Sequence, residues 1–266
     1  MNEKLAIVGG GAIATGLATI ACTHEPVTIC VRSEQSAERT RALVDKTCAR
    51  HKPEPIDPTQ ITVTTDLAAV GDATAVVEAI AEELEHKVEL WGRLAPLVAA
   101  DALLGSTTSS LSVQAIADAS GAPERFVGLH VFNPVTQMKL VELAYPAQAT
   151  ADTRARAHTL CEALEKEPVE VPDTPGFVVN RLLFPYLFSA VDFQAESGLE
   201  SEAIDTCMKL GAGHPMGPLA LLDYVGLDVS KAIGEAIGVR VPPRIEQLVA
   251  EGALGRKSGR GFYDYS

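Results

Sequence analysis

His130 and Glu142 are the two residues of this chain best suited to proton transfer. His130 stands at the end of one apolar run, and Glu142 lies inside a second apolar run that follows after a short polar interval. Two such runs predict neighbouring strands on which the side chains can meet. Imidazole titrates near neutral pH, and a carboxylate on its far nitrogen fixes the tautomer and stabilises the imidazolium. The pattern favours an acid–base dyad; the alternative is a histidine held by backbone groups and a glutamate at a sheet edge.

A glycine-rich turn near the start of the chain indicates a nucleotide site. The apolar run 4–8 is followed by G-G-G-A-I-A-T-G at 9–16 and by a helix-compatible stretch. In this order Gly9 permits the turn, Gly11 lets a pyrophosphate approach the helix N-terminus, and Ala14 replaces the third glycine of G-x-G-x-x-G. We expect a dinucleotide here; the alternative is a tight β–α turn without a ligand. The contacts expected from the turn are Gly9, Gly11, Ala12 and Ile13.

The end of the next predicted strand, residues 27–31, indicates which dinucleotide binds. NAD-binding folds usually have Asp or Glu there for the ribose 2′-hydroxyl, whereas NADP-binding folds often have arginine for the 2′-phosphate. This chain has Arg32 and Ser33, which are suited to holding a phosphate. We therefore expect NADP to be preferred over NAD. The alternative is a solvent-facing arginine, with water on the ribose hydroxyl.

A local excess of basic residues follows in the segment 32–52, which carries six basic residues against three acidic ones. On a helix, Arg39 and Lys46, with Arg41 and Arg50, would give a positive face for a phosphorylated substrate handle. The alternative is an ordinary solvated helix face.

Composition excludes several classes of partner and site. A net charge of −13 argues against binding to nucleic acid or to an anionic membrane. The five cysteines are scattered without a C-x-x-C pair, so neither a disulfide framework nor a zinc site is expected, and no other metal is. The sequence shows neither a run of eighteen apolar residues nor a signal-peptide pattern, so it predicts a soluble, cytoplasmic protein.

Strands alternating with helices predict an α/β fold with a Rossmann-type, doubly wound parallel sheet. Ligands of such sheets bind outside the carboxyl ends of the strands, where Gly9, Arg32, Glu82 and Ser109 fall. The segment P-D-T-P-G at 172–176 marks a change to a purely helical pattern. We predict a dinucleotide-binding domain at 1–172 and a smaller all-α domain at 173–266.

A wide apolar stripe marks the first helix of the second domain, predicted at residues 177–197. A stripe this wide must pack on another surface, and a second subunit is one candidate. Its members are Phe177, Leu183, Phe184, Leu187, Phe188 and Val191.

The chain resembles the L-3-hydroxyacyl-CoA dehydrogenases, a family that includes 3-hydroxybutyryl-CoA dehydrogenase. Besides the glycine turn, the matching motifs are V-E-A-I-A-E at 77–82, S-T-T-S at 106–109, G-L-H-V-F-N-P at 128–134, L-V-E-L at 140–143, D-T-P-G-F-V-V-N-R at 173–181, M-K-L-G-A-G-H-P-M-G-P at 208–218 and G-R-K-S-G-R-G-F-Y at 255–263. So many ordered matches at consistent spacing extend over nearly the whole chain.

The resemblance implies hydride transfer between NAD(P) and C3 of a 3-hydroxyacyl or 3-oxoacyl-CoA thioester. It assigns His130 as the acid–base and Glu142 as the group that orients it, and it places Ser109 and Asn180 at the reacting oxygen. It also implies a homodimer formed through the helical domain. The remaining contacts that it implies are Glu82, Lys87, Ser109 and Asn133 for the cofactor, and Arg39 and Lys46 for CoA.

Departures from the family pattern leave other readings open. Thr107 stands where the family usually has asparagine, and Arg32 follows Val31 where an acid would hold the ribose. One alternative is the same chemistry on a substrate carried by acyl carrier protein, which shares the phosphopantetheine arm of CoA. Another is a catalytically retired structural protein, which the presence of both His130 and Glu142 disfavours. An enzyme for free hydroxy acids is disfavoured because such enzymes generally use a lysine near the position of Asn180.

Overall fold

The computed structural model describes residues 3–52 and 54–265. The chain divides into two compact units, Met1–Phe177 and Val178–Ser266. Each unit has its own apolar core. The predicted fold class, a Rossmann-type sheet followed by an all-α region, is confirmed.

The first unit is built on an eight-stranded sheet with the order β3-β2-β1-β4-β5-β6-β7-β8. Neighbouring strands are parallel except for β6 and β7, which are antiparallel. Most of the strands are short apolar runs, as expected of strands covered on both faces. The strands are β1 (Leu5–Val8), β2 (Val27–Cys30), β3 (Ile61–Thr64), β4 (Ala75–Glu78), β5 (Leu103–Ser106), β6 (Phe126–Val131), β7 (Leu140–Ala144) and β8 (Glu167–Val171).

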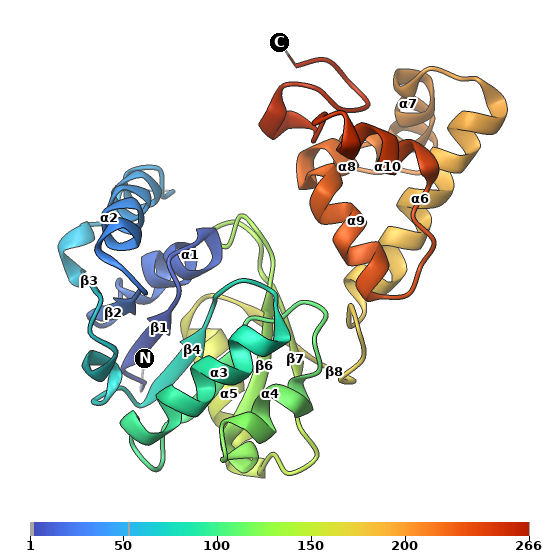
Figure 1. Ribbon diagram of the computed structural model, residues 1–266. Helices are drawn as coiled ribbons and strands as arrows, with labels where there is room; N and C mark the ends of the chain where they lie inside the picture. Colours follow the sequence, from blue (N-terminus) through green and yellow to red (C-terminus); the bar gives the residue numbers. More distant parts are fainter. Residues whose placement is uncertain (1–2, 53, 266) are drawn as a thin grey trace. The chain divides into compact units, whose positions relative to one another are not determined.

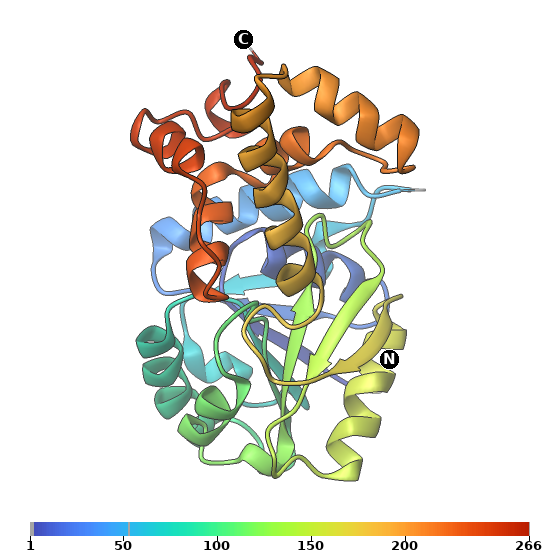
Figure 2. The same cartoon turned by 90° about the vertical axis from the view of Figure 1, so that its right-hand side faces the viewer.

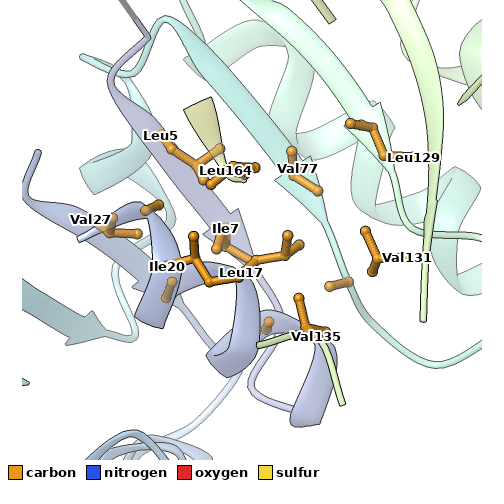
Figure 3. Close-up of a cluster of buried hydrophobic side chains, with 14 of the residues drawn as sticks. Leu5, Ile7, Leu17, Ile20, Val27, Val77, Leu129, Val131, Val135 and Leu164 are labelled. Atoms are coloured by element: carbon orange, nitrogen blue, oxygen red, sulfur yellow. The ribbon is translucent and has the colours of Figure 1, made fainter. Parts of the chain in front are cut away.

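Helices cover both faces of this sheet (Figure 1). Alternate side chains of β1 enter different cores, because successive residues of a strand point to opposite faces. Leu5 and Ile7 pack with α1 (Ala12–Ala21), α2 (Glu34–Ala49) and α5 (Ala151–Ala163), and Figure 3 shows part of this cluster. Ala6 and Val8 pack with α3 (Leu84–Leu94) and α4 (Val113–Ala119).

The segment at the predicted domain boundary is anchored in the first unit. Asp173 accepts hydrogen bonds from the backbone N–H groups of Val113 at 3.0 Å and Gln114 at 2.9 Å, at the N-terminus of α4. Phe177 packs in the core beneath α3 and α4 and has a φ of 47°, so the predicted helix cannot begin there. The helix begins at Val179 instead.

The second unit consists, in its described part, of helices around one core. The helices are α6 (Val179–Ser197), α7 (Ser201–Gly211), α8 (Pro218–Val225), α9 (Leu227–Ala236) and α10 (Pro243–Ala250). Two buried carboxylates hold parts of this unit together. Asp205 of α7 accepts from the backbone N–H groups of Leu219 and Ala220 in α8, and Asp223 accepts from those of Phe262 and Tyr263.

The apolar stripe of α6 packs within this unit, so a second subunit, which was one candidate for its partner, is not needed to bury it. Phe184, Leu187, Phe188 and Val191 are buried in the core of the second unit. The exposed apolar side chains of α6 are others: Leu182 is 70% exposed and Phe193 is 53% exposed. No described helix is long and apolar enough to pass through a lipid bilayer.

Candidate active site

His130 and Glu142 face each other across the antiparallel strands β6 and β7. The strand register pairs the two residues directly, and Nδ1 of His130 lies 2.6 Å from Oε2 of Glu142. Figure 2 shows the two strands side by side in yellow-green. His130 is 5% exposed and Glu142 is 1% exposed, so little water screens the pair. With Nδ1 bonded to the carboxylate, Nε2 is the ring nitrogen through which His130 can exchange a proton with a ligand.

Two aromatic rings lie beside the imidazole. The ring centroid of Phe132 is 4.4 Å from that of His130, and the centroid of Phe177 is 5.4 Å away. Phe132 follows β6 directly, and Phe177 is the last residue of the first unit. The rings restrict the orientations of the imidazole, so its position relative to Glu142 is set by packing as well as by the hydrogen bond.

The glycine turn between β1 and α1 has the shape that a pyrophosphate requires. Gly9 has a φ of 136°, and a Cβ there would meet the carbonyl oxygen of Ala79 at 2.2 Å. Only glycine fits this position. Gly11 is the N-cap of α1, and a Cβ built on it meets no atom of the described residues within 4 Å. An exposed helix N-terminus with open space before it attracts a phosphate. Ala12 is exposed and Ile13 is half-buried at the same end of α1.

A buried ion pair that the sequence analysis did not assign lies at the end of β4. Oε1 of Glu78 is 2.6 Å from Nζ of Lys87, and Oε2 of Glu78 accepts from the Ser106 hydroxyl at 2.7 Å. Both charged side chains are fully buried. The signal for this pair was present in the sequence, because an acid at the end of an apolar strand needs a partner inside the protein.

Glu82, on the segment after β4, contacts Ser109, on the loop after β5; both are predicted site residues. Oε1 of Glu82 accepts from the backbone N–H groups of Ser109 at 2.7 Å and Ser110 at 2.9 Å, and from the Thr108 hydroxyl at 2.7 Å. Burial raises the pKa of Glu82, but the Lys87 ammonium and these hydrogen bonds outweigh it, so the pKa lies below its ordinary value. The carboxylate is therefore ionised at neutral pH. Lys87 remains near it, with Nζ 3.6 Å from Oε2 of Glu82.

The remaining predicted site residues lie on other elements of the chain. Arg32 is exposed, and the hydroxyl of Ser33 caps α2 by accepting from the backbone N–H of Ser36 at 3.2 Å. Arg39 and Lys46 are exposed on α2, whereas Arg41 donates to the carbonyl of Val63. Asn133 is exposed in the segment between β6 and β7, and Asn180 is 8% exposed near the start of α6 in the second unit.

Two family models match the chain, one after the other. Residues 4–174 match the NAD binding domain of 3-hydroxyacyl-CoA dehydrogenase, and residues 176–265 match its C-terminal domain. The description of the first model supports the use of NAD. It does not support the NADP preference expected from Arg32.

Full-length relatives show the same similarity. The chain is 37% identical over 277 residues to the probable 3-hydroxybutyryl-CoA dehydrogenase of Deinococcus radiodurans, covering 98% of this chain and 100% of that protein. It is 38% identical over 286 residues to the mitochondrial hydroxyacyl-coenzyme A dehydrogenase of Rattus norvegicus, covering 99% and 91%. The crystal structure of (S)-3-hydroxybutyryl-CoA dehydrogenase from Ralstonia eutropha superimposes with a TM-score of 0.91 at 34% identity, covering 99% of both chains. Both the sequence and the structure therefore show that this chain belongs to the 3-hydroxyacyl-CoA dehydrogenase family.

Proposed function

We propose that this chain is an NAD-dependent oxidoreductase that interconverts a 3-hydroxyacyl-CoA and the corresponding 3-oxoacyl-CoA. The observation that carries the proposal is the His130–Glu142 pair, buried and directly opposed across β6 and β7 in a member of this family. The names of the relatives, 3-hydroxybutyryl-CoA dehydrogenase among them, support a short acyl chain on CoA.

In the proposed reaction His130 moves the proton of the substrate hydroxyl. During oxidation, Nε2 takes this proton while Glu142 stabilises the imidazolium that forms; during reduction, the imidazolium returns a proton to the substrate oxygen. A bound nicotinamide would accept the hydride from C3 in oxidation and return it in reduction. Ser109 and Asn180 are proposed to donate hydrogen bonds to the substrate oxygen, which gains negative charge during reduction. For this the Ser109 hydroxyl has to turn away from Oε1 of Glu82, to which it donates at 3.1 Å.

The residues at the glycine turn fit NAD, because Gly9 and Gly11 leave the N-terminus of α1 open to a pyrophosphate. Glu82, Lys87 and Asn133 are proposed to contact the nicotinamide half of the cofactor. Arg39 and Lys46 are proposed to hold the CoA phosphates, since both are exposed on α2 and seven positions apart, which places them on one face of the helix.

The first test is the reaction itself. The purified protein is expected to reduce acetoacetyl-CoA with NADH, measured as the loss of NADH absorbance. The same acyl group on acyl carrier protein serves as the comparison substrate. Activity on the carrier-protein substrate alone would move the assignment to that substrate class, and inactivity on both would contradict the proposed function.

The second test concerns the dyad. His130→Ala and Glu142→Gln are each expected to lower kcat by about 100- to 10,000-fold, the usual contribution of general acid–base catalysis. The dissociation constant of NADH should change little. His158 and Glu170 form a matched pair on the surface, with Nε2 and Oε1 3.1 Å apart, so His158→Ala is the control with normal kcat. Near-normal kcat in either dyad variant would rule out the assigned roles.

We also propose that Arg32 shifts the choice of cofactor towards NADP. An exposed guanidinium at the end of β2 stands where a ribose 2′-phosphate is held in this fold. Arg32→Ala is expected to lower kcat/KM for NADPH about tenfold or more, because a hydrogen bond to a charged group contributes roughly 1.5–3 kcal/mol. The value for NADH should be unchanged, as it should be in the surface control Arg93→Ala. A strong NADH preference that is the same with and without Arg32 would refute the idea.

A homodimer through the helical unit is the final part of the proposal. A hollow of about 590 Å³ lies between α6 and α7, and its lining includes Phe193, Leu199 and Met208. Leu210, near the end of α7, is 84% exposed. Apolar side chains gathered in this way are typical of an interface. Light scattering of the wild type should give twice the mass of one chain. The Phe193→Asp variant should give the mass of a single chain. Val88→Asp, on α3 of the first unit, should leave the dimer intact. A wild-type monomer would contradict this part.

A further inference from the structure

We propose that Lys166 is a positioning residue of the reaction proposed above: it fixes the segment 132–139, which joins the strands of His130 and Glu142. The side chain lies directly before β8 and is 6% exposed. Its Nζ donates to the backbone carbonyls of Val135 and Met138, the latter at 2.9 Å.

Burial lowers the pKa of the Lys166 ammonium, with Glu165 and Cys161 acting in the opposite direction. A buried charge is costly unless polar groups replace the water that it has lost. Here those groups include two carbonyls from a single short segment. The ammonium therefore draws two peptide groups of the segment towards the start of β8. The residue after Lys166 adds a backbone hydrogen bond to the same segment: the N–H of Glu167 donates to the carbonyl of Lys139 at 2.8 Å.

The segment is also held from the side of the nucleotide site. Val135 is 2% exposed and packs on α1 at Gly16, where a Cβ would lie 2.7 Å from Cβ of Val135. Figure 3 shows Val135 beside α1 and near Leu17. Val135 thus has its side chain against the helix of the glycine turn and its carbonyl on Lys166. Val135 therefore connects the segment both to α1 and to Lys166.

The segment carries groups that matter to the reaction. Phe132 places its ring 4.4 Å from the imidazole of His130, and Asn133 is a proposed cofactor contact. If the ammonium is lost, the carbonyls of Val135 and Met138 lose this donor, and we expect the segment to move so that they reach another donor or water. A movement of about 1 Å in a positioning element lowers turnover by roughly 100-fold.

The experiment compares Lys166→Met, which keeps the apolar stem and removes the charge, with Lys166→Arg, which keeps a cationic donor. Lys166→Met is expected to lower kcat/KM for acetoacetyl-CoA reduction by about 100-fold and to weaken NADH binding, at a temperature where circular dichroism shows it fully folded. Hydrogen exchange should rise in residues 132–139 and stay unchanged in β1 and β4. Lys166→Arg should recover part of the activity. The control Lys139→Met removes an exposed lysine from the same segment and should behave as wild type.

A folded Lys166→Met protein with normal kcat/KM and normal NADH binding would overturn the proposal, even if its melting temperature falls. If this variant does not fold, Val135→Ala replaces it, because it loosens the same segment from α1 without removing a charge. Unchanged turnover and NADH affinity in Val135→Ala would also overturn the proposal. If the wild type does not reduce acetoacetyl-CoA, the proposed function fails, whereas NADH binding and hydrogen exchange still report on Lys166.

Discussion

The hydrogen bond between Nδ1 of His130 and Oε2 of Glu142 is the interaction on which the rest of the site depends. It depends on the register of the antiparallel strands β6 and β7, which pairs the two residues directly. Their neighbours Leu129 and Leu143 point to the opposite face and belong to the apolar core. The same alternation therefore buries one face of this strand pair and presents the dyad on the other.

Glu78, Lys87 and Lys166 are buried charged residues of the first unit, and each has polar partners, as has Glu82, which is exposed. Glu78 pairs with Lys87, and Lys166 holds two backbone carbonyls. Glu82 accepts several hydrogen bonds from the loop after β5. A buried charge is tolerated only with such partners, and removing one partner leaves the other in an unfavourable environment. These contacts therefore restrict the loops to a narrow range of positions. An active site needs loops that are held in this way.

Much of the fold could be predicted from the sequence, because local patterns specify it. The strand predicted at residues 27–31 is present as β2 (Val27–Cys30), and the glycine turn correctly predicted the step from β1 to α1. The antiparallel direction of β7 could not be predicted, because apolar runs carry no sign of direction. The bounds of helix α4 could not be predicted because it has seven residues, too few for a periodic pattern. The partner of the apolar stripe on α6 could not be predicted, because a pattern shows that a face is buried without showing what covers it.

The site was predictable as a set of residues, and less so as a set of contacts. His130 and Glu142 carry a recognisable pattern, whereas Lys166 acts through Val135 and Met138, which are distant from it in sequence. One further consequence concerns Phe177. It is the last residue of the first unit, it has a left-handed backbone, and its ring packs on His130. The residue at the boundary between the two units is thus one of those that surround the imidazole. A change of the backbone torsion angles at Phe177 would therefore change the environment of the base.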